Sequence, residues 1–165
     1  MHIRHTTADD LAAALELNNA NVPAVNELDA PELARLVGLS LLSLTAEVDG
    51  AFAGFCVVLP RGVDYGSLNY AWFTRYHAEA DRDFAYLDRI AVDASFRRYG
   101  IGRGFYRELQ ERLTGLVPVL SCEVNIRPRN DVSLEFHRSI GFVEVGQQDT
   151  DGGKKTVSLL ELALG

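Results

Sequence analysis

Residues 97–104 read Arg97-Arg98-Tyr99-Gly100-Ile101-Gly102-Arg103-Gly104, a basic stretch with three glycines between a strand-like run and a helix-like run. Glycine lets the backbone approach a ligand closely, and the free N–H groups at a helix start favour negative charge. The stretch therefore predicts a binding loop for a phosphorylated ligand.

Two common phosphate loops do not fit this stretch. A Walker A loop would end in Gly-Lys-Ser/Thr, which is absent, and a dinucleotide loop counted from Gly100 would need glycine where the chain has Phe105. The missing third glycine disfavours a dinucleotide oxidoreductase. What remains is an Arg-x-x-Gly-x-Gly pattern formed by Arg97, Gly100 and Gly102.

The neighbours of the loop predict a strand, a helix and a second strand. Residues 84–92 have apolar side chains at both odd and even positions, which is typical of a central strand covered on both faces. Apolar residues then recur at helical spacing from Ile101 to Leu113, and residues 120–126 alternate between apolar and polar. A strand, a helix and a strand in succession predict a parallel crossover.

The rest of the chain divides into further elements with recognisable boundaries. An Asp49-Gly50 pair between two apolar runs predicts a tight hairpin. A capping-box pattern at Thr7–Asp10 opens the first helix, and Asp29-Ala30-Pro31 opens the second. The predicted helices cover residues 11–21, 29–38 and 131–140, and the other strands cover 3–5, 42–48, 52–59, 142–148 and 156–164.

Length and charge narrow the class of protein. The chain has 165 residues, is 47% hydrophobic and shows no repeat or linker, so we expect a single domain over residues 1–165. The net charge of −7 disfavours nucleic-acid and anionic-membrane partners. Between Arg97 and Arg112, however, the chain contains five arginines and two glutamates, which gives this segment a charge of +3. This basic segment suits an anionic ligand, and the acidic remainder suits a cationic amine.

Cysteine usage and the N-terminus bear on metal sites and location. Cys56 and Cys122 lie in strand-like runs without His or Cys partners at metal-ligand spacing, so we expect buried thiols and no metal. Neither a signal peptide nor a membrane-spanning run is found, which makes the cytoplasm the expected location.

A second motif lies downstream of the loop: Asn130-x-x-Ser133-x-x-Phe136-His137-x-x-x-Gly141-Phe142. With these two motifs in order on the expected elements, the chain resembles the GNAT acyltransferase superfamily over nearly its whole length, except residues 60–83. The resemblance implies an α/β (α+β) GNAT acyl-CoA N-acyltransferase fold, with a central mixed twisted sheet of about seven strands flanked by about four helices.

The resemblance also implies acetyl-CoA as cosubstrate. Its pantetheine would lie where the strands at 84–92 and 117–126 diverge, pairing with the backbone of the first like an added strand. For Arg97, a contact to pyrophosphate competes with an ordinary surface position, and for Asn130, binding of pantetheine amides competes with capping of the following helix. The residues implied for acetyl-CoA are Leu87, Ile90, Ala91, Val92, Arg97, Arg98, Tyr99, Gly100, Ile101, Gly102, Arg103, Asn130, Ser133 and Phe136.

Three residues are candidates for catalytic proton transfer. His137 replaces the tyrosine that protonates the leaving thiolate in many members, and the alternative is an imidazole packed beside Phe136. Glu123 and Asp88 are candidate bases for deprotonating the amine. The alternatives are a hydrogen bond near Ser121 for Glu123 and an ion pair with a nearby arginine for Asp88.

The segment between residues 60 and 83 is rich in aromatic residues and longer than a simple connection. A lid or substrate wall would place Tyr70, Trp72 and Tyr76 against the acceptor. An aromatic mini-core or a subunit interface is the alternative, so a homodimer stays open.

The resemblance implies an N-acetyltransferase in which a primary amine attacks the thioester directly. No Gly-x-Ser-x-Gly elbow or Cys-His motif indicates a covalent intermediate. The acceptor is either a small amine or a peptide amine. The alternative from another class is a non-catalytic CoA-binding sensor or interaction module with the same fold.

Overall fold

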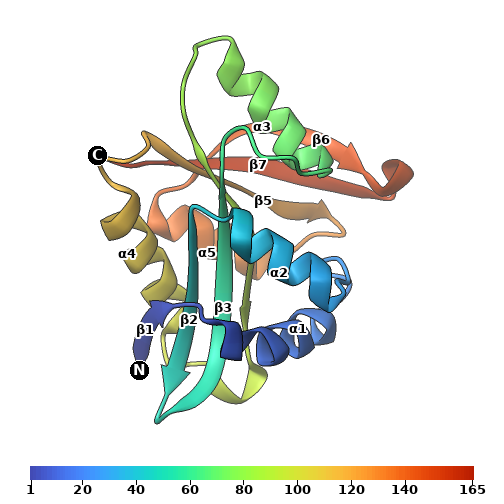
Figure 1. The fold of residues 1–165 in the computed structure, drawn as a ribbon. Coiled ribbons are helices and arrows are strands. Elements are labelled where there is room, and N and C mark those ends of the chain that lie inside the picture. Colours follow the sequence, from blue (N-terminus) through green and yellow to red (C-terminus); the bar gives the residue numbers. More distant parts are fainter. The chain divides into compact units, whose positions relative to one another are not determined.

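The computed structural model describes residues 1–165 and contains seven β-strands, five α-helices and three short 3-10 helices (Figure 1). The strands are β1 (His2–His5), β2 (Leu42–Val48), β3 (Ala51–Pro60), β4 (Ala85–Val92), β5 (Val119–Arg127), β6 (Val143–Thr150) and β7 (Lys155–Ala163). The α-helices are α1 (Leu11–Ala20), α2 (Ala30–Leu39), α3 (Leu68–Ala78), α4 (Ile101–Leu113) and α5 (Asp131–Ile140). The 3-10 helices are η1 (Ala8–Asp10), η2 (Ala94–Phe96) and η3 (Asp151–Gly153).

The strands pair in the order β1-β2-β3-β4-β5-β7-β6, which confirms the predicted mixed sheet of seven strands. The structure has five α-helices where the sequence predicted about four. The additional one is α3, which lies in the segment between residues 60 and 83. Ser67 caps it by accepting a hydrogen bond from the N–H of Tyr70 at 3.2 Å.

The chain divides into two compact units. The first unit comprises Met1–Pro60 and Leu87–Arg112, and the second comprises Arg61–Tyr86 and Leu113–Gly165. The expectation of a single domain over residues 1–165 stays a prediction.

The first unit contains the β2–β3 hairpin that the Asp49-Gly50 pair predicts. Both residues have positive φ, 51° and 80°, as a tight turn between twisted strands requires. The sheet formed by β1, β2 and β3 has different neighbours on its two faces. Thr45 donates to Asp10 of η1 at 3.2 Å on one face, whereas Gly104 of α4 lies against Ile3 of β1 on the other. Figure 1 shows α1 and α2 lying together alongside β3.

Gly54 of β3 is the glycine of the first unit with the least room for a side chain. A Cβ atom at Gly54 would lie 2.6 Å from the carbonyl oxygen of Ala91 and 3.3 Å from the Cα of Val92. Glycine is therefore needed here to keep β3 close to the end of β4, the strand that leads to the glycine loop.

We expect Gly54→Ala to lower the free energy of unfolding by about 1–3 kcal/mol, because the added methyl group overlaps backbone that cannot move aside. Urea denaturation measures the change. The control is Gly38→Ala, at an exposed helical position with open space around it, which we expect to stabilise by about 0.5–1 kcal/mol. Equal stability of the Gly54→Ala variant and the parent would contradict the close packing.

Asp10 forms a partly buried ion pair with Arg4 that connects η1 to β1. Its carboxylate accepts two hydrogen bonds from the Arg4 guanidinium, at 2.7 and 2.9 Å, and one from the Thr7 N–H at 2.7 Å. The hydrogen bonds from Arg4 are the main reason that the pKa of Asp10 falls from 3.8 to about 2.

This shift predicts acid-sensitive stability. Because the folded-state pKa lies below the unfolded one, the contribution is full above pH 3.8 and is lost as pH falls through 2. We expect the free energy of unfolding to lose about 2 kcal/mol through this group between pH 5 and pH 2. Asp10→Asn should remove this part of the pH dependence, and the exposed neighbour variant Asp9→Asn should retain it. If the free energy of unfolding depended on pH in the same way in both variants, the assignment of this pH dependence to Asp10 would be refuted.

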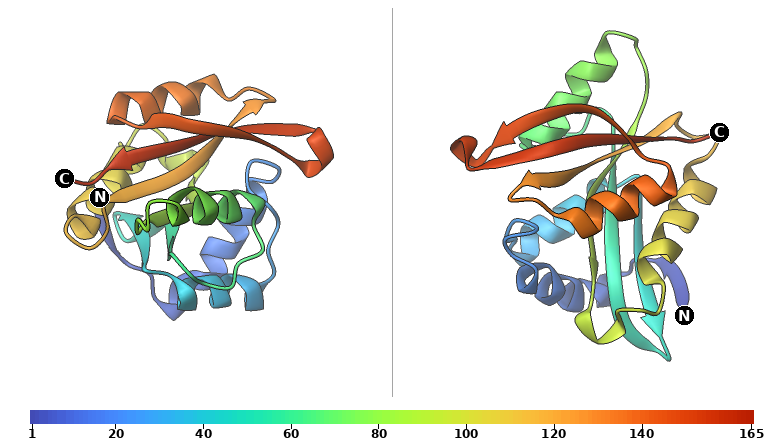
Figure 2. Two further views of the ribbon diagram at one scale, coloured as in Figure 1. Left: turned by 90° about the horizontal axis from the view of Figure 1, so that it is seen from above. Right: turned by 180° about the vertical axis from the view of Figure 1, so that it is seen from behind.

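The second unit is built on the antiparallel strands β5, β7 and β6, with the start of β4 parallel to β5. The parallel register joins Ala85 to Leu120 and Tyr86 to Ser121. Trp72 of α3 lies against Gly146 of β6 on one face of these strands, whereas Gly141 at the end of α5 lies beside Leu162 of β7 on the other. Figure 2, seen from above, shows α3 and α5 on opposite sides of the β6–β7 hairpin.

Neither cysteine is available for chemistry. Both are buried free thiols, as expected, and burial raises the pKa of Cys56 to about 12 and that of Cys122 as well. No group of three or more metal-ligating side chains occurs, and none of the helices combines the length and apolar character that crossing a bilayer demands.

Candidate functional site

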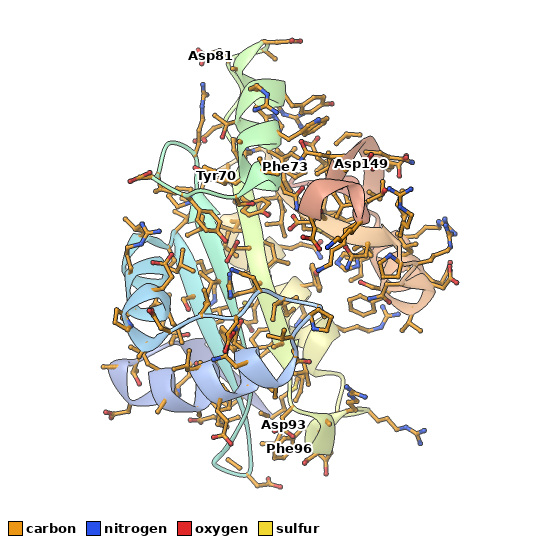
Figure 3. All side chains as sticks on the ribbon, turned by 90° about the vertical axis from the view of Figure 1, so that its right-hand side faces the viewer. Tyr70, Phe73, Asp81, Asp93, Phe96 and Asp149 are labelled. Atoms are coloured by element: carbon orange, nitrogen blue, oxygen red, sulfur yellow. The ribbon has the colours of Figure 1, made fainter.

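The predicted phosphate loop lies in the first unit, between β4 and α4. Asp93 follows β4, donates its N–H to the Ala53 carbonyl and caps η2 by accepting from the Ser95 N–H at 2.7 Å. Figure 3 labels Asp93 and Phe96 at this turn. Arg98 and Gly100 have φ values of 77° and 73°, so the backbone reverses tightly before α4 begins.

Several N–H groups at the start of α4 have no acceptor within the helix. The first helical hydrogen bond runs from the Gly104 N–H to the Gly100 carbonyl at 2.9 Å, and the N–H groups of residues 101–103 precede it. Residues 97–100 are exposed, and neither Arg97 nor Arg98 forms an ion pair. The loop thus offers both N–H donors and uncommitted positive charge to an anion.

On β4, the residues predicted to bind pantetheine alternate in burial. Leu87 and Ala91 are buried, whereas Ile90 and Val92 are half-buried. The side chains of Leu87 and Ala91 therefore pack in the core. Binding of the ligand there stays a prediction.

Asp88 pairs with an arginine, as its alternative interpretation held. Its carboxylate is 2.7 Å from the Arg89 Nε, and both side chains are at most 3% exposed. Arg89 also donates to the side-chain oxygens of Asn18 and Asn26, at 2.9 and 3.0 Å. The network connects β4 to α1 and to the segment before α2. A role for Asp88 as a base stays a prediction.

Glu123 lies half-buried on β5 in the second unit. The Tyr86 hydroxyl lies 2.9 Å from its Oε1 and 2.8 Å from its Oε2 and donates to this carboxylate. Ser121 directs its hydroxyl to Glu161 instead, at 3.4 Å. The Glu123 carboxylate is therefore fixed by the Tyr86 hydroxyl and is partly accessible to solvent, as a general base requires.

Asn130 caps α5, which is one of the two roles considered for it. Its side-chain oxygen accepts a hydrogen bond from the Ser133 N–H at 3.1 Å. The same contact positions Ser133 at the start of the helix. Contacts of Asn130, Ser133 and Phe136 with a cosubstrate stay predictions.

His137 is packed and hydrogen-bonded within α5. It is 7% exposed, its ring meets Phe136 and Phe142 edge to face, and its Nδ1 is 2.7 Å from the Ser133 carbonyl oxygen. A carbonyl only accepts, so Nδ1 carries the proton. Burial lowers the pKa of His137 below its usual value, against a smaller opposing effect of the Ser133 carbonyl. The favoured neutral ring has a lone pair on Nε2, and donation from that atom requires protonation of the ring.

The aromatic residues between residues 60 and 83 form a packed cluster on α3. Tyr70 is buried, and its hydroxyl accepts from the Val63 N–H at 3.1 Å. Trp72 stacks on Tyr76 with ring centres 4.8 Å apart, and Tyr76 is exposed. Figure 3 labels Tyr70 and Phe73 on this helix. The cluster matches the mini-core alternative, and contacts of these residues with an acceptor stay predictions.

Sequence reasoning missed two buried polar arrangements in the second unit. One is the Tyr86–Glu123 contact, since Tyr86 lies in a run that predicts only core packing. The other joins His77 to Glu161, with Nε2 and Oε1 2.6 Å apart. Burial lowers the pKa of His77 to about 4 and raises that of Glu161. Neither arrangement has a local sequence signal, because its members lie 37 and 84 positions apart.

A seven-stranded mixed sheet, in which a strand leads through a basic glycine loop into a helix, is the arrangement expected of the acyl-CoA-dependent acyltransferases that the sequence resembles. The model of the acetyltransferase (GNAT) family matches residues 12–142. The chain therefore belongs to the GNAT family and is an acyltransferase that uses acetyl-CoA, as predicted.

Solved structures with the same fold cover almost the whole chain. The ribosomal-protein-alanine N-acetyltransferase of Brucella melitensis is 25% identical, with a TM-score of 0.73 and coverage of 99% of this chain and 100% of that one. The ribosomal-protein-S18-alanine N-acetyltransferase of Escherichia coli is 21% identical, with a TM-score of 0.74 and coverage of 99% and 94%. A Salmonella typhimurium protein solved with acetyl-CoA is 20% identical, with a TM-score of 0.70 and coverage of 100% and 94%. A comparison with curated proteins finds no significant match.

Proposed function

We propose that this protein is an N-acetyltransferase that transfers the acetyl group of acetyl-CoA to a primary amine, which attacks directly without a covalent enzyme intermediate. The observation that carries the proposal is the loop at residues 97–103. It combines N–H groups that precede the first helical hydrogen bond, the start of α4 and two exposed arginines without ion pairs. These features fit the pyrophosphate of an acyl-CoA.

Different residues of the chain are proposed to have different roles in the reaction. Bound acetyl-CoA supplies a thioester whose carbonyl carbon accepts the amine nitrogen and whose sulfur leaves as the thiol. The backbone N–H groups of β4 are proposed to polarise the thioester carbonyl. Glu123 is proposed to accept the proton that the amine loses, directly or through water, because its carboxylate is held and partly exposed.

His137 is the proposed donor of the proton that the leaving sulfur takes up. His137 has its Nδ1 proton engaged by the Ser133 carbonyl, so donation from Nε2 needs a protonated ring. Burial opposes that charge. We keep His137 as the proposed donor for a direct test, in which His137→Gln is compared with His137→Tyr.

A peptide amine is the acceptor that we propose to test first. The Brucella melitensis and Escherichia coli structures are both named as alanine N-acetyltransferases of ribosomal proteins. The acidic charge of the chain also suits a cationic acceptor. We place the reaction in the cytoplasm, with no nucleic-acid or membrane partner.

Calorimetry with acetyl-CoA, followed by thiol release in an amine panel, tests the proposed function. The panel should contain peptides with N-terminal alanine, lysine-containing peptides with blocked N-termini, and small diamines. We expect saturable binding and thiol release with at least one of these classes. Saturable binding without release across the panel would favour the non-catalytic CoA-binding module.

A further inference from the structure

Tyr86 is almost completely buried and yet has a polar contact with the proposed base. It is 1% exposed, and its hydroxyl lies within 2.9 Å of both carboxylate oxygens of Glu123. Tyr86 is paired with Ser121 across the parallel strands, and Glu123 lies two residues beyond Ser121. Tyr86 and Glu123 are therefore diagonal neighbours on one face of the sheet.

The ring of Tyr86 is fixed by the aromatic cluster on α3. Tyr70 meets it edge to face with ring centres 5.5 Å apart, and Phe73 packs on it at 5.9 Å. This packing restricts the orientation of the ring and therefore the position of its hydroxyl oxygen. The segment between residues 60 and 83 thus acts on Glu123 through Tyr86.

The geometry of the contact determines what it does to the carboxylate. A tyrosine hydroxyl has one proton, so at similar distances from both oxygens it straddles the carboxylate and fixes the plane of that group. A hydrogen bond donated to a carboxylate also favours its ionised form. A carboxylate has about four lone-pair sites, so a single hydroxyl donor does not by itself prevent Glu123 from accepting a proton.

We propose that Tyr86 is a positioning residue that orients Glu123 and keeps it ionised for deprotonation of the acceptor amine. The inference rests on the proposed function of Glu123 as the base. Tyr86 itself exchanges no proton with the substrate and acts only through this carboxylate.

Tyr86→Phe removes the hydroxyl and retains the ring that packs against Tyr70 and Phe73. We expect kcat to fall on the order of tenfold, because a hydrogen bond to a charged group is lost. The KM for acetyl-CoA should not change. The acidic limb of the pH–rate profile should move to higher pH, since the variant carboxylate is protonated more easily. A loss of packing alone would lower stability without moving this limb.

A double-mutant cycle with Glu123→Gln tests whether Tyr86 acts through Glu123. We expect Tyr86→Phe to have no further effect on kcat in the Glu123→Gln background. The same fold loss in both backgrounds would overturn the proposal, because Tyr86 would then act independently of Glu123. The matched control is Tyr106→Phe, which removes the hydroxyl of another buried tyrosine, on α4, and should leave kcat and the pH profile unchanged.

A measurement that needs no turnover separates this inference from the proposed function. Carbon-13 NMR of labelled glutamate follows the titration of the Glu123 carboxyl in the parent and in Tyr86→Phe. We expect the midpoint to rise in the variant, and an unchanged midpoint would overturn the positioning role. Absence of thiol release by the parent would instead count against the proposed function.

Discussion

The paired substitution Arg97→Ala and Gly100→Glu is expected to weaken acetyl-CoA binding by roughly a hundredfold, because charge-assisted contacts to the pyrophosphate are lost and a like charge is added. Arg97 is exposed and forms no ion pair, so its removal disturbs no internal contact. Gly100 has a φ of 73° and open space around its Cα, so the glutamate side chain can project from the loop. Calorimetry measures the change in Kd.

The matched control for this experiment is Arg107→Ala combined with Gly115→Glu. Gly115 also has a positive φ, 81°, and open space around it, and Arg107 is an exposed residue of α4. This pair changes the net charge by the same amount and introduces similar backbone strain away from the loop. We expect it to bind acetyl-CoA like the parent. Equal weakening by both pairs would mean that overall charge, and not the loop, governs binding.

Glu123→Gln is expected to lower kcat by about 10²–10³-fold and to leave the Kd for acetyl-CoA unchanged. Glutamine has nearly the shape of glutamate and can still accept from the Tyr86 hydroxyl, but it cannot take a proton from the amine. The loss should narrow as pH approaches the pKa of the acceptor amine, because the amine then becomes neutral without a base. Steady-state thiol release across a range of pH measures both effects.

The control for the base is Glu135→Gln on α5. Glu135 is exposed and forms an ion pair with Arg138 three residues later. The substitution therefore removes a carboxylate whose only recorded contact is an exposed ion pair on the helix surface. We expect its kcat to equal that of the parent. If Glu123→Gln also retained full kcat, the proposed base would be wrong, and Asp88 would become the remaining carboxylate candidate.

The sequence predicted most of the elements because their signals are local. The Asp49-Gly50 turn and the helix from Ile101 to Leu113 both appear in the structure where they were expected. Helix α3 was missed as a helix because its aromatic residues show no clear amphipathic period. Tertiary packing against Phe84 and Tyr86 gives these residues their place in the core.

The sequence by itself determined the class of fold and the form of the phosphate loop. The spacing of the glycines, the strand before them and the helix start after them are set by residues close together in the sequence. Such local features can be recognised in a single sequence.

Only the tertiary structure decided which partners the candidate catalytic residues have. Asp88 is paired with Arg89, Glu123 is held by Tyr86, and the Ser133 carbonyl selects the His137 tautomer. The physical reason is that side-chain direction, burial and strand register together choose among many possible partners. Because Tyr86 and Glu123 meet only when Tyr86 lies opposite Ser121, no local pattern in either strand reveals their contact.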